Sequence, residues 1–196
     1  MNKKILITGA SGFIGNHLIE HLLQDGEPAN RLRIVLSKAV SAKRLPQGKF
    51  DIVVGDIRDK KFCKKAMRGV ETVYHLASRI SLDAGTYTSY KEINVDGTVN
   101  LLEACIGKKM QKFVFISSVA VYGLPPFTTN IPNLDESHPK TYSDKEIYRR
   151  TKAEAEEEAV TAHKKWGLPY AIIRPSTVYG PGNIGIIGTL YQALKS

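Results

Sequence analysis

Short apolar runs alternate with amphipathic stretches along almost the whole chain. The apolar runs are continuous and rich in Val and Ile, which is typical of parallel strands buried on both faces. The stretches between them carry apolar residues at helical spacing. Strands that alternate with helices form βαβ units, so the pattern predicts an α/β fold with a doubly wound parallel sheet.

The boundaries of the predicted elements follow from this alternation and from turn residues. Strands are predicted at 4–8, 32–37, 51–55, 72–77, 112–117 and 169–174. Helices are predicted at 13–24, 59–68, 90–107 and 144–166, the last of them stopped by Gly167 and Pro169. The proline-containing stretch 124–141 is predicted to be a long loop beside the functional site.

The chain has 196 residues and a net charge of +9. Its basic residues occur in short groups on predicted helices, so solvated helix faces explain most of them, and no nucleic-acid module is indicated. The first apolar run is only three residues long, too short for a signal peptide, and no stretch could cross a bilayer. A cytoplasmic protein with no membrane partner is therefore expected. Cys63 and Cys105 have no partner motif, and no metal site is expected.

A glycine-rich turn follows the first predicted strand, with Gly9, Gly12 and Gly15 in the segment 8–15. Gly9 would let the chain turn sharply out of the strand. Gly12 would let backbone amides approach a pyrophosphate, and Gly15 would let the next helix lie close on the sheet. The start of that helix would attract an anion with its free amides and dipole.

This turn resembles the cofactor fingerprint of the extended short-chain dehydrogenase/reductase family, which includes epimerases, dehydratases and ketone reductases. Further segments resemble motifs of that family in matching order, at 55–59, 75–78, 94–98, 116–123 and 174–182. The resemblance implies a Rossmann domain over residues 1–180. Members normally continue further, so residues 181–196 are expected to be the start of a truncated substrate-binding region.

The predicted helix 144–166 carries Tyr148 and Lys152 four residues apart, so both side chains can point into one cleft. A free tyrosine has a pKa near ~10, and a nearby cation lowers it. Tyr148 is therefore predicted to be the acid/base catalyst. Ser117 and Ser118 compete for the third catalytic position, and the resemblance favours Ser118.

The resemblance also implies a set of cofactor contacts, Lys152 with the cofactor ribose among them. The predicted cofactor-binding residues are Gly9, Ser11, Gly12, Phe13, Ile14, Gly15, Ser37, Lys38, Asp56, Ile57, Leu76, Ala77, Ser78, Asn94, Ser117, Lys152, Pro175 and Val178. For Asn94 a buried structural amide is an equal alternative, and His75 is expected to be a packed residue rather than a catalyst.

The end of the second predicted strand usually selects the cofactor. An acidic residue there binds the ribose of NAD, and a basic one accommodates the extra phosphate of NADP. Here Ser37 and Lys38 follow the strand and no acidic residue occurs before Asp51. NADP is therefore favoured, with NAD as the alternative.

Three functions are compatible with these residues. The first is an NAD(P)-dependent oxidoreductase acting on a ketone or secondary alcohol. The second is a sugar-nucleotide epimerase or dehydratase, which regenerates its cofactor within one turnover. The third is a non-catalytic NAD(P)-binding sensor. A small-molecule substrate is the expected partner, and a homodimer through the long helix is usual in the family.

Overall fold

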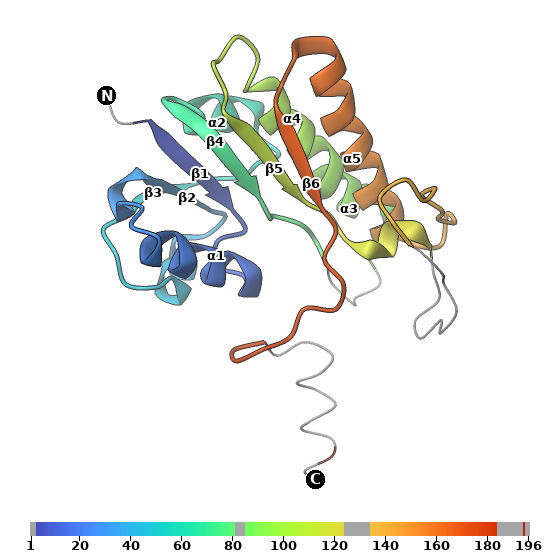
Figure 1. Ribbon diagram of the computed structural model, residues 1–196, viewed down its shortest axis with the longest axis horizontal. Coiled ribbons are helices and arrows are strands. Elements are labelled where there is room, and N and C mark those ends of the chain that lie inside the picture. The colour runs from blue at the N-terminus through green and yellow to red at the C-terminus, as the bar shows by residue number, and fades with distance from the viewer. Residues whose placement is uncertain (1–2, 81–84, 124–133, 184–193, 195–196) are drawn as a thin grey trace.

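In the computed structural model, which describes residues 3–80, 85–123, 134–183 and 194, one six-stranded parallel sheet has the order β3-β2-β1-β4-β5-β6. All strands point toward the same edge (Figure 1). The strand order reverses between β1 and β4, as in the predicted doubly wound arrangement. The strands are β1 Lys4–Thr8, β2 Leu32–Leu36, β3 Asp51–Val54, β4 Val70–His75, β5 Lys112–Ile116 and β6 Tyr170–Ile173.

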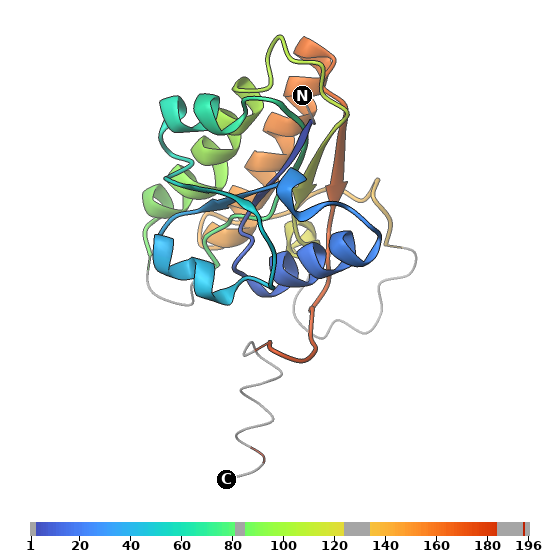
Figure 2. The same ribbon diagram turned by 90° about the vertical axis from the view of Figure 1, so that its left-hand side faces the viewer.

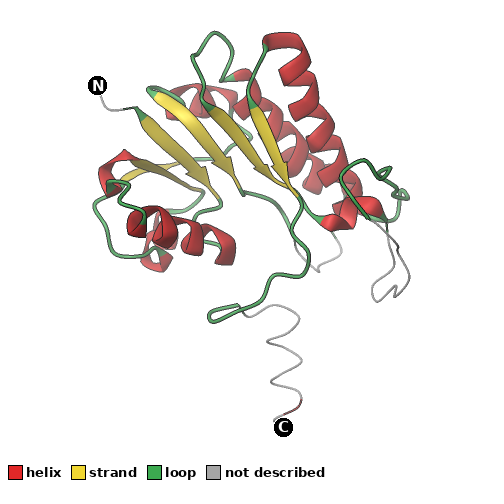
Figure 3. Cartoon of the chain, in the orientation of Figure 1, coloured by secondary structure: helices red, strands yellow, loops and turns green. Residues whose placement is uncertain are grey.

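Helices cover both faces of the sheet (Figure 2). One face carries α1 (Phe13–Gln24), and the other carries α2 (Lys60–Ala66), α4 (Gly97–Glu103) and α5 (Ile147–Trp166). Figure 3 shows the remaining short helical segments as red pieces between strands and loops. These are η1 Ala29–Arg31, η2 Ala39–Arg44, α3 Tyr87–Lys91, η3 Glu92–Asp96 and η4 Val119–Tyr122.

Each face of the sheet has its own apolar core. The core under α2, α4 and α5 is built around the fully buried rings of Phe113 and Phe115 on β5. The core under α1 contains Ile7, Ile19 and Ile34. The continuous apolar runs of the sequence therefore correspond to strands packed on both sides.

The helix predicted at 90–107 is the element that differs most from the structure. The chain instead forms α3, then the π-helical segment η3, then α4. In the π-helical segment Asn94 and Val95 are buried. Such segments insert an extra residue into a turn and are frequent at functional sites, and the 3.6-residue pattern of apolar positions does not reveal them.

Two other boundaries differ from the prediction. β4 begins at Val70 rather than at 72, because Val70 pairs with Lys4 of β1, and Glu71 next to it is buried with its carboxylate 2.9 Å from Lys3 and 3.1 Å from Arg31. α5 begins at Ile147 rather than at 144, because the Glu146 carboxylate accepts the backbone N–H of Ser143 at 3.0 Å and closes a turn there.

The predicted loop 124–141 is irregular over residues 134–141, and its first part lies outside the described residues. Most of the predicted region 181–196 also lies outside them. Within the described ranges, no helix has both the length and the apolar character needed to cross a membrane.

Replacing Phe113 by Ala is expected to lower the free energy of unfolding by about 3–5 kcal/mol, because it empties a fully buried ring position. Phe50→Ala is the matched control, since that ring is only partly buried against the other core. Urea unfolding of both variants measures the difference. Equal losses would contradict the assignment of Phe113 to the centre of the core.

Candidate active site

The carboxyl ends of the central strands border a cavity of about 800 Å³. Its walls come from the glycine turn, the end of β4, the β5–η4 junction, α5 and the segment after β6. The lining residues are Gly9, Gly12, Phe13, Ile14, Gly15, Leu76, Ser78, Ile80, Ile116, Ser117, Ser118, Val119, Ala120, Leu134, Tyr148, Arg149, Lys152, Pro175, Ser176, Thr177, Val178 and Asn183. In open α/β sheets this is the edge where ligands bind.

The glycine turn has a different constraint at each of its three glycines. Gly9 has a φ of +69°, and a Cβ there would lie 2.7 Å from the backbone nitrogen of Ala77. A Cβ on Gly15 would collide with the carbonyl oxygen of Gly9. At Gly12 the only close atom is the Gly9 oxygen at 3.2 Å, and the residue is exposed on the cavity wall. Gly12 therefore leaves the start of α1 open to a ligand.

Asn16, which was not among the predicted site residues, holds this turn together. Its side-chain amide donates to the carbonyl oxygens of Ala10 at 3.1 Å and Gly12 at 3.0 Å. These hydrogen bonds hold the two carbonyl groups toward α1, so the turn keeps one conformation without a ligand. The available signal was an amide side chain directly after the third glycine.

Seven of the predicted cofactor residues are not among the residues that line the cavity: Ser11, Ser37, Lys38, Asp56, Ile57, Ala77 and Asn94. Ser11 and Ala77 belong to segments that line the cavity. Ser37 and Lys38 are exposed after β2. Asp56 follows β3, where its carboxylate is held by Arg58 at 2.6 Å, and this hydrogen bond lowers the pKa of Asp56.

Ile57 is buried, with 6% of its surface exposed, and packs against Gly97 at the start of α4. Its carbonyl oxygen accepts a hydrogen bond from the Asn100 amide at 3.0 Å. The structure therefore gives Ile57 a packing role, and a direct cofactor contact by this residue stays a prediction.

The three predicted catalytic residues line the same cavity. Ser118 caps η4, where its hydroxyl oxygen accepts the backbone N–H of Ala120 at 3.2 Å. A hydrogen bond joins the side chains of Ser118 and Tyr148. Tyr148 lies in the first turn of α5 and Lys152 lies one turn further along.

Lys152 is almost completely buried, with 1% of its surface exposed. Its ammonium donates to the carbonyl oxygen of Ile116 at 2.5 Å and lies 4.2 Å from the ring centre of Phe115. Burial lowers the pKa of Lys152 to about 7, against a smaller opposing effect of Glu156. The lysine can therefore exchange a proton near neutral pH.

The predicted lowering of the Tyr148 pKa is wrong for this structure. Burial raises the pKa of Tyr148, and only the hydrogen bond with Ser118 opposes it. The physical reason is that the Lys152 ammonium is directed to the Ile116 carbonyl. Helical spacing places the two residues on one face but does not fix where the ammonium points.

His75 joins the ends of β1 and β4 inside the protein. Its Nδ1 lies 2.7 Å from the Thr8 hydroxyl and its Nε2 lies 2.8 Å from the Thr98 hydroxyl. Thr98 donates its proton to the Asn94 carbonyl at 2.6 Å, so it accepts from His75, whose Nε2 then carries the proton. Burial, and next the charge of Lys152, lower the pKa of His75 to about 3. His75 is thus a packed neutral residue, as expected.

Asn94 links the cavity wall to α5. Its amide oxygen accepts from the Ser78 hydroxyl at 3.1 Å and the Arg79 N–H at 2.7 Å. Its nitrogen donates to the Thr151 hydroxyl at 3.0 Å and the Arg79 carbonyl at 3.3 Å. With 2% of its surface exposed and its amide fully used, Asn94 matches the alternative of a buried structural amide.

An ion pair between Arg174 and the buried Glu156 helps to anchor the segment before α5. Arg174 binds Glu156 through two hydrogen bonds, at 3.0 and 2.8 Å. Arg174 also donates to the Tyr122 hydroxyl at 2.6 Å, and that hydroxyl donates to the Asp135 carbonyl at 3.0 Å. The end of β6, η4 and the irregular segment are thereby fixed around the cavity. Nothing in the spacing of these residues indicated the contact.

The reversed strand order and the glycine turn define the fold as a Rossmann fold. The model of the NAD dependent epimerase/dehydratase family matches residues 5–193, so the chain belongs to this family.

Known proteins similar to this chain include dehydrogenases and epimerases. A 3beta-hydroxysteroid-dehydrogenase/decarboxylase isoform 2 of Arabidopsis thaliana is 30% identical over 97% of this chain and 35% of its own length. A UDP-glucose 4-epimerase of Vibrio cholerae is 32% identical over 93% of this chain and 54% of its own length. The crystal structure of the Thermus thermophilus UDP-glucose 4-epimerase complex with NAD superposes with a TM-score of 0.78 at 30% identity, over 92% of this chain and 57% of that chain. The chain thus spans between a third and two thirds of these relatives.

Replacing Lys152 by Met is expected to flatten the pH dependence of stability between about pH 7 and pH 10.5. Lys152 loses its proton near pH 7 when folded and near 10.5 when unfolded. In that window the unfolded chain binds more protons, so the stability of the wild type rises with pH, and the variant loses this part of the rise.

Urea unfolding at a series of pH values measures the effect, and Lys49→Met, at an exposed position, is the control. A Lys152→Met variant that kept the full rise would contradict the lowered pKa.

Proposed function

We propose that this chain is the cofactor-binding and catalytic part of an NAD(P)-dependent enzyme that transfers hydride between nicotinamide and a ketone or secondary alcohol. The observation that carries the proposal is the cavity that Gly12, Ser118, Tyr148 and Lys152 share. When bound, the nicotinamide cofactor would supply or accept the hydride. The similarity to dehydrogenases and epimerases, some solved with NAD, supports this choice.

The residues present fit a dinucleotide. The open side of Gly12 and the start of α1 suit a pyrophosphate, which would take the place that a Cβ would fill. The Ser117 hydroxyl oxygen is buried on the cavity wall and has no hydrogen-bond partner among the described residues. Buried hydroxyls without a partner are rare in folded proteins, so Ser117 is assigned to the ligand.

Tyr148 is proposed to move the proton that accompanies hydride transfer. Its raised pKa keeps the hydroxyl protonated at neutral pH, which suits donation to a carbonyl oxygen during reduction. Ser118 holds the Tyr148 hydroxyl and would hydrogen-bond the same substrate oxygen. Lys152, which lies one helical turn away and has a pKa near 7, would replace the proton or bind a ribose hydroxyl.

An epimerase or dehydratase is the second candidate. The sequence identity is 32% to the Vibrio cholerae epimerase and 30% to the plant dehydrogenase, so sequence similarity does not favour either activity. Both candidates need the same redox step, and they differ in whether the cofactor is consumed. A non-catalytic sensor is less favoured, since it has no use for three catalytic side chains around one cavity.

A homodimer through α5 stays a prediction, to be checked by light scattering.

Tyr148→Phe is expected to bind cofactor within about twofold of the wild type and to lose turnover by about a hundredfold or more, because only proton transfer is removed. Turnover is followed as NADPH or NADH consumption with a set of ketones and as interconversion of UDP-sugars. Net consumption identifies the oxidoreductase, and interconversion without consumption identifies the epimerase. Unchanged turnover in Tyr148→Phe would exclude its acid/base role.

The preference for NADP is a further part of this proposal. The end of β2 offers Ser37 and Lys38, both exposed, and Lys43 and Arg44 follow in η2. The stretch 37–50 contains no Asp or Glu. It therefore has no carboxylate that could bind the ribose 2′-hydroxyl of NAD or repel the 2′-phosphate of NADP.

Lys38→Glu is expected to weaken NADPH binding by about tenfold or more and to leave NADH binding unchanged, because a charged hydrogen bond to the phosphate is lost. Calorimetry with both cofactors measures this. Lys49→Glu is a control with the same charge change, and Gly12→Val should block both cofactors. Equal losses for NADPH and NADH in Lys38→Glu would contradict the preference.

A further inference from the structure

The edge of the sheet opposite the cavity carries a concentration of positive charge. α2, α4 and α5 pack side by side on one face of the sheet and run opposite to the strands, so their carboxyl ends meet at this edge. The end of each helix, or the loop after it, holds one lysine pair: Lys64–Lys65, Lys108–Lys109 and Lys164–Lys165. We refer to these three pairs together with Ile106 and Trp166 as the lysine-pair face.

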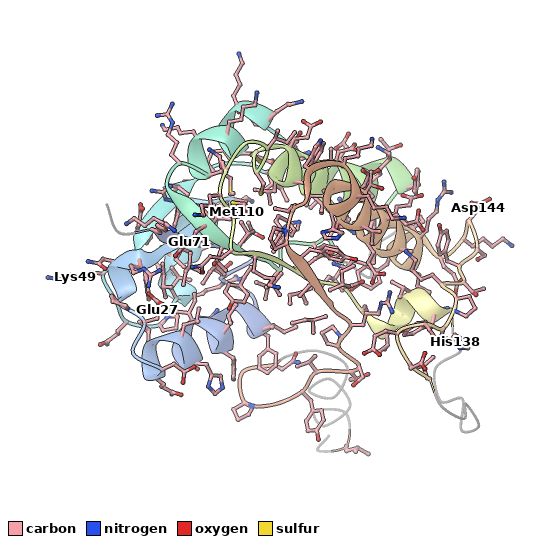
Figure 4. All side chains as sticks on the ribbon, turned by 45° about the horizontal axis from the view of Figure 1, so that its top comes forward. Glu27, Lys49, Glu71, Met110, His138 and Asp144 are labelled. Carbon is pink, nitrogen blue, oxygen red and sulfur yellow. The ribbon has the colours of Figure 1, made fainter. Side chains whose placement is uncertain are left out.

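The lysine-pair face is exposed and carries little opposing charge. All six lysines are exposed, and none forms an ion pair in the part of the chain that the structure describes. The stretches 60–70, 104–112 and 159–170 contain no Asp or Glu, and Glu103, the last residue of α4, is paired with Lys60. By contrast, Glu71, labelled on this side of the molecule in Figure 4, is buried and paired with Lys3 and Arg31.

Helix dipoles do not account for this charge. The carboxyl end of a helix is equivalent to about half a negative elementary charge. The positive charge of two lysines at each end is therefore larger than the partial negative charge of the helix dipole. The surplus is available to an external anion.

Two large apolar side chains lie within this charged surface. Trp166 is 44% exposed and Ile106 is 50% exposed. They border a hollow of about 180 Å³ whose walls are residues 105–110 and 166–169. An exposed Trp among lysines is typical of proteins that rest on a lipid interface, because the ring prefers the headgroup level while lysines bind anionic lipids.

We propose that the lysine-pair face binds the surface of a membrane that contains anionic phospholipid. The three pairs place point charges along one edge of the sheet, which suits a plane of headgroups. A nucleic-acid site would favour a groove with arginine forks and stacked aromatic rings. The sequence alone indicated solvated helix faces and no membrane partner. The proposal departs from the second of these predictions, because it assigns the surface of a membrane as a partner.

Docking through this face would leave the cavity open to water, because the cavity lies at the opposite edge of the sheet. The proposal is thus independent of the proposed function. Cofactor binding and vesicle binding can succeed or fail separately.

Trp166 provides a direct test, since it is the only tryptophan of the chain. The chain is mixed with vesicles of equal parts phosphatidylcholine and phosphatidylglycerol, and with vesicles of phosphatidylcholine alone. The expected result is co-sedimentation with the anionic vesicles only, a blue shift of the Trp166 emission, and release at about 1 M salt, where screening is strong. No binding, or equal binding to both vesicles, would overturn the proposal.

Matched charge reversals locate the contact. Lys108→Glu with Lys109→Glu is expected to weaken vesicle binding by about tenfold or more. Lys43→Glu with Arg44→Glu changes the net charge equally, away from the lysine-pair face, and should retain most of the binding. Thermal unfolding verifies that both variants fold. Equal losses in the two variants would show that net charge alone is responsible and would overturn the assignment to this face.

A nucleic-acid partner is the competing outcome. A mixed-sequence DNA duplex is titrated into the chain under the same salt conditions. Weak binding that does not displace the vesicles supports the proposal. Displacement of the vesicles by the duplex at lower concentration, with no blue shift of Trp166, would overturn it in favour of nucleic acid.

Discussion

The hydrogen bond between Thr8 and His75 joins the two central strands at the point where the order of the sheet reverses. The same Thr8 hydroxyl also accepts the backbone N–H of Ala77, which fixes the chain leaving β4 beside the glycine turn. On its other side His75 reaches Thr98, and through it Asn94. Because Asn94 binds Thr151 on α5, one continuous set of buried hydrogen bonds connects the proposed phosphate site to the helix that carries Tyr148 and Lys152.

Burial controls the charges at this site more than proximity does. Lys152 and His75 are both buried, and each is shifted toward its neutral form, His75 partly by the charge of Lys152. Tyr148 is likewise held in its neutral, protonated form. These shifts support the proposal that the site transfers a proton near neutral pH. The ion pair of Arg174 with Glu156 contains two hydrogen bonds and helps to hold the surrounding loop.

The parallel sheet places the two proposed binding sites at its opposite edges. The carboxyl edge collects the glycine turn, Ser118 and the start of α5 around the cavity. The amino edge collects the carboxyl ends of the helices, with their lysines and Trp166. This separation follows from parallel strands with antiparallel crossover helices, which place all helix starts at one edge and all helix ends at the other.

The sequence by itself determined the α/β class, the six strands to within two residues, and α1 without error, because apolar runs and glycine spacing act locally. It also indicated that the glycine turn, Ser118, Tyr148 and Lys152 lie around one cavity, since parallel strands end together, but not that Ile80, Leu134 and Asn183 line it as well. Only the tertiary structure decided that the Lys152 ammonium points to the Ile116 carbonyl, and that Arg174 pairs with Glu156. It also decided that the amide of Asn94, within a π-helical segment, has all its hydrogen bonds to other residues of the protein. These depend on contacts between residues far apart in the chain, and burial of those contacts, rather than residue spacing, sets the pKa values of Tyr148 and Lys152.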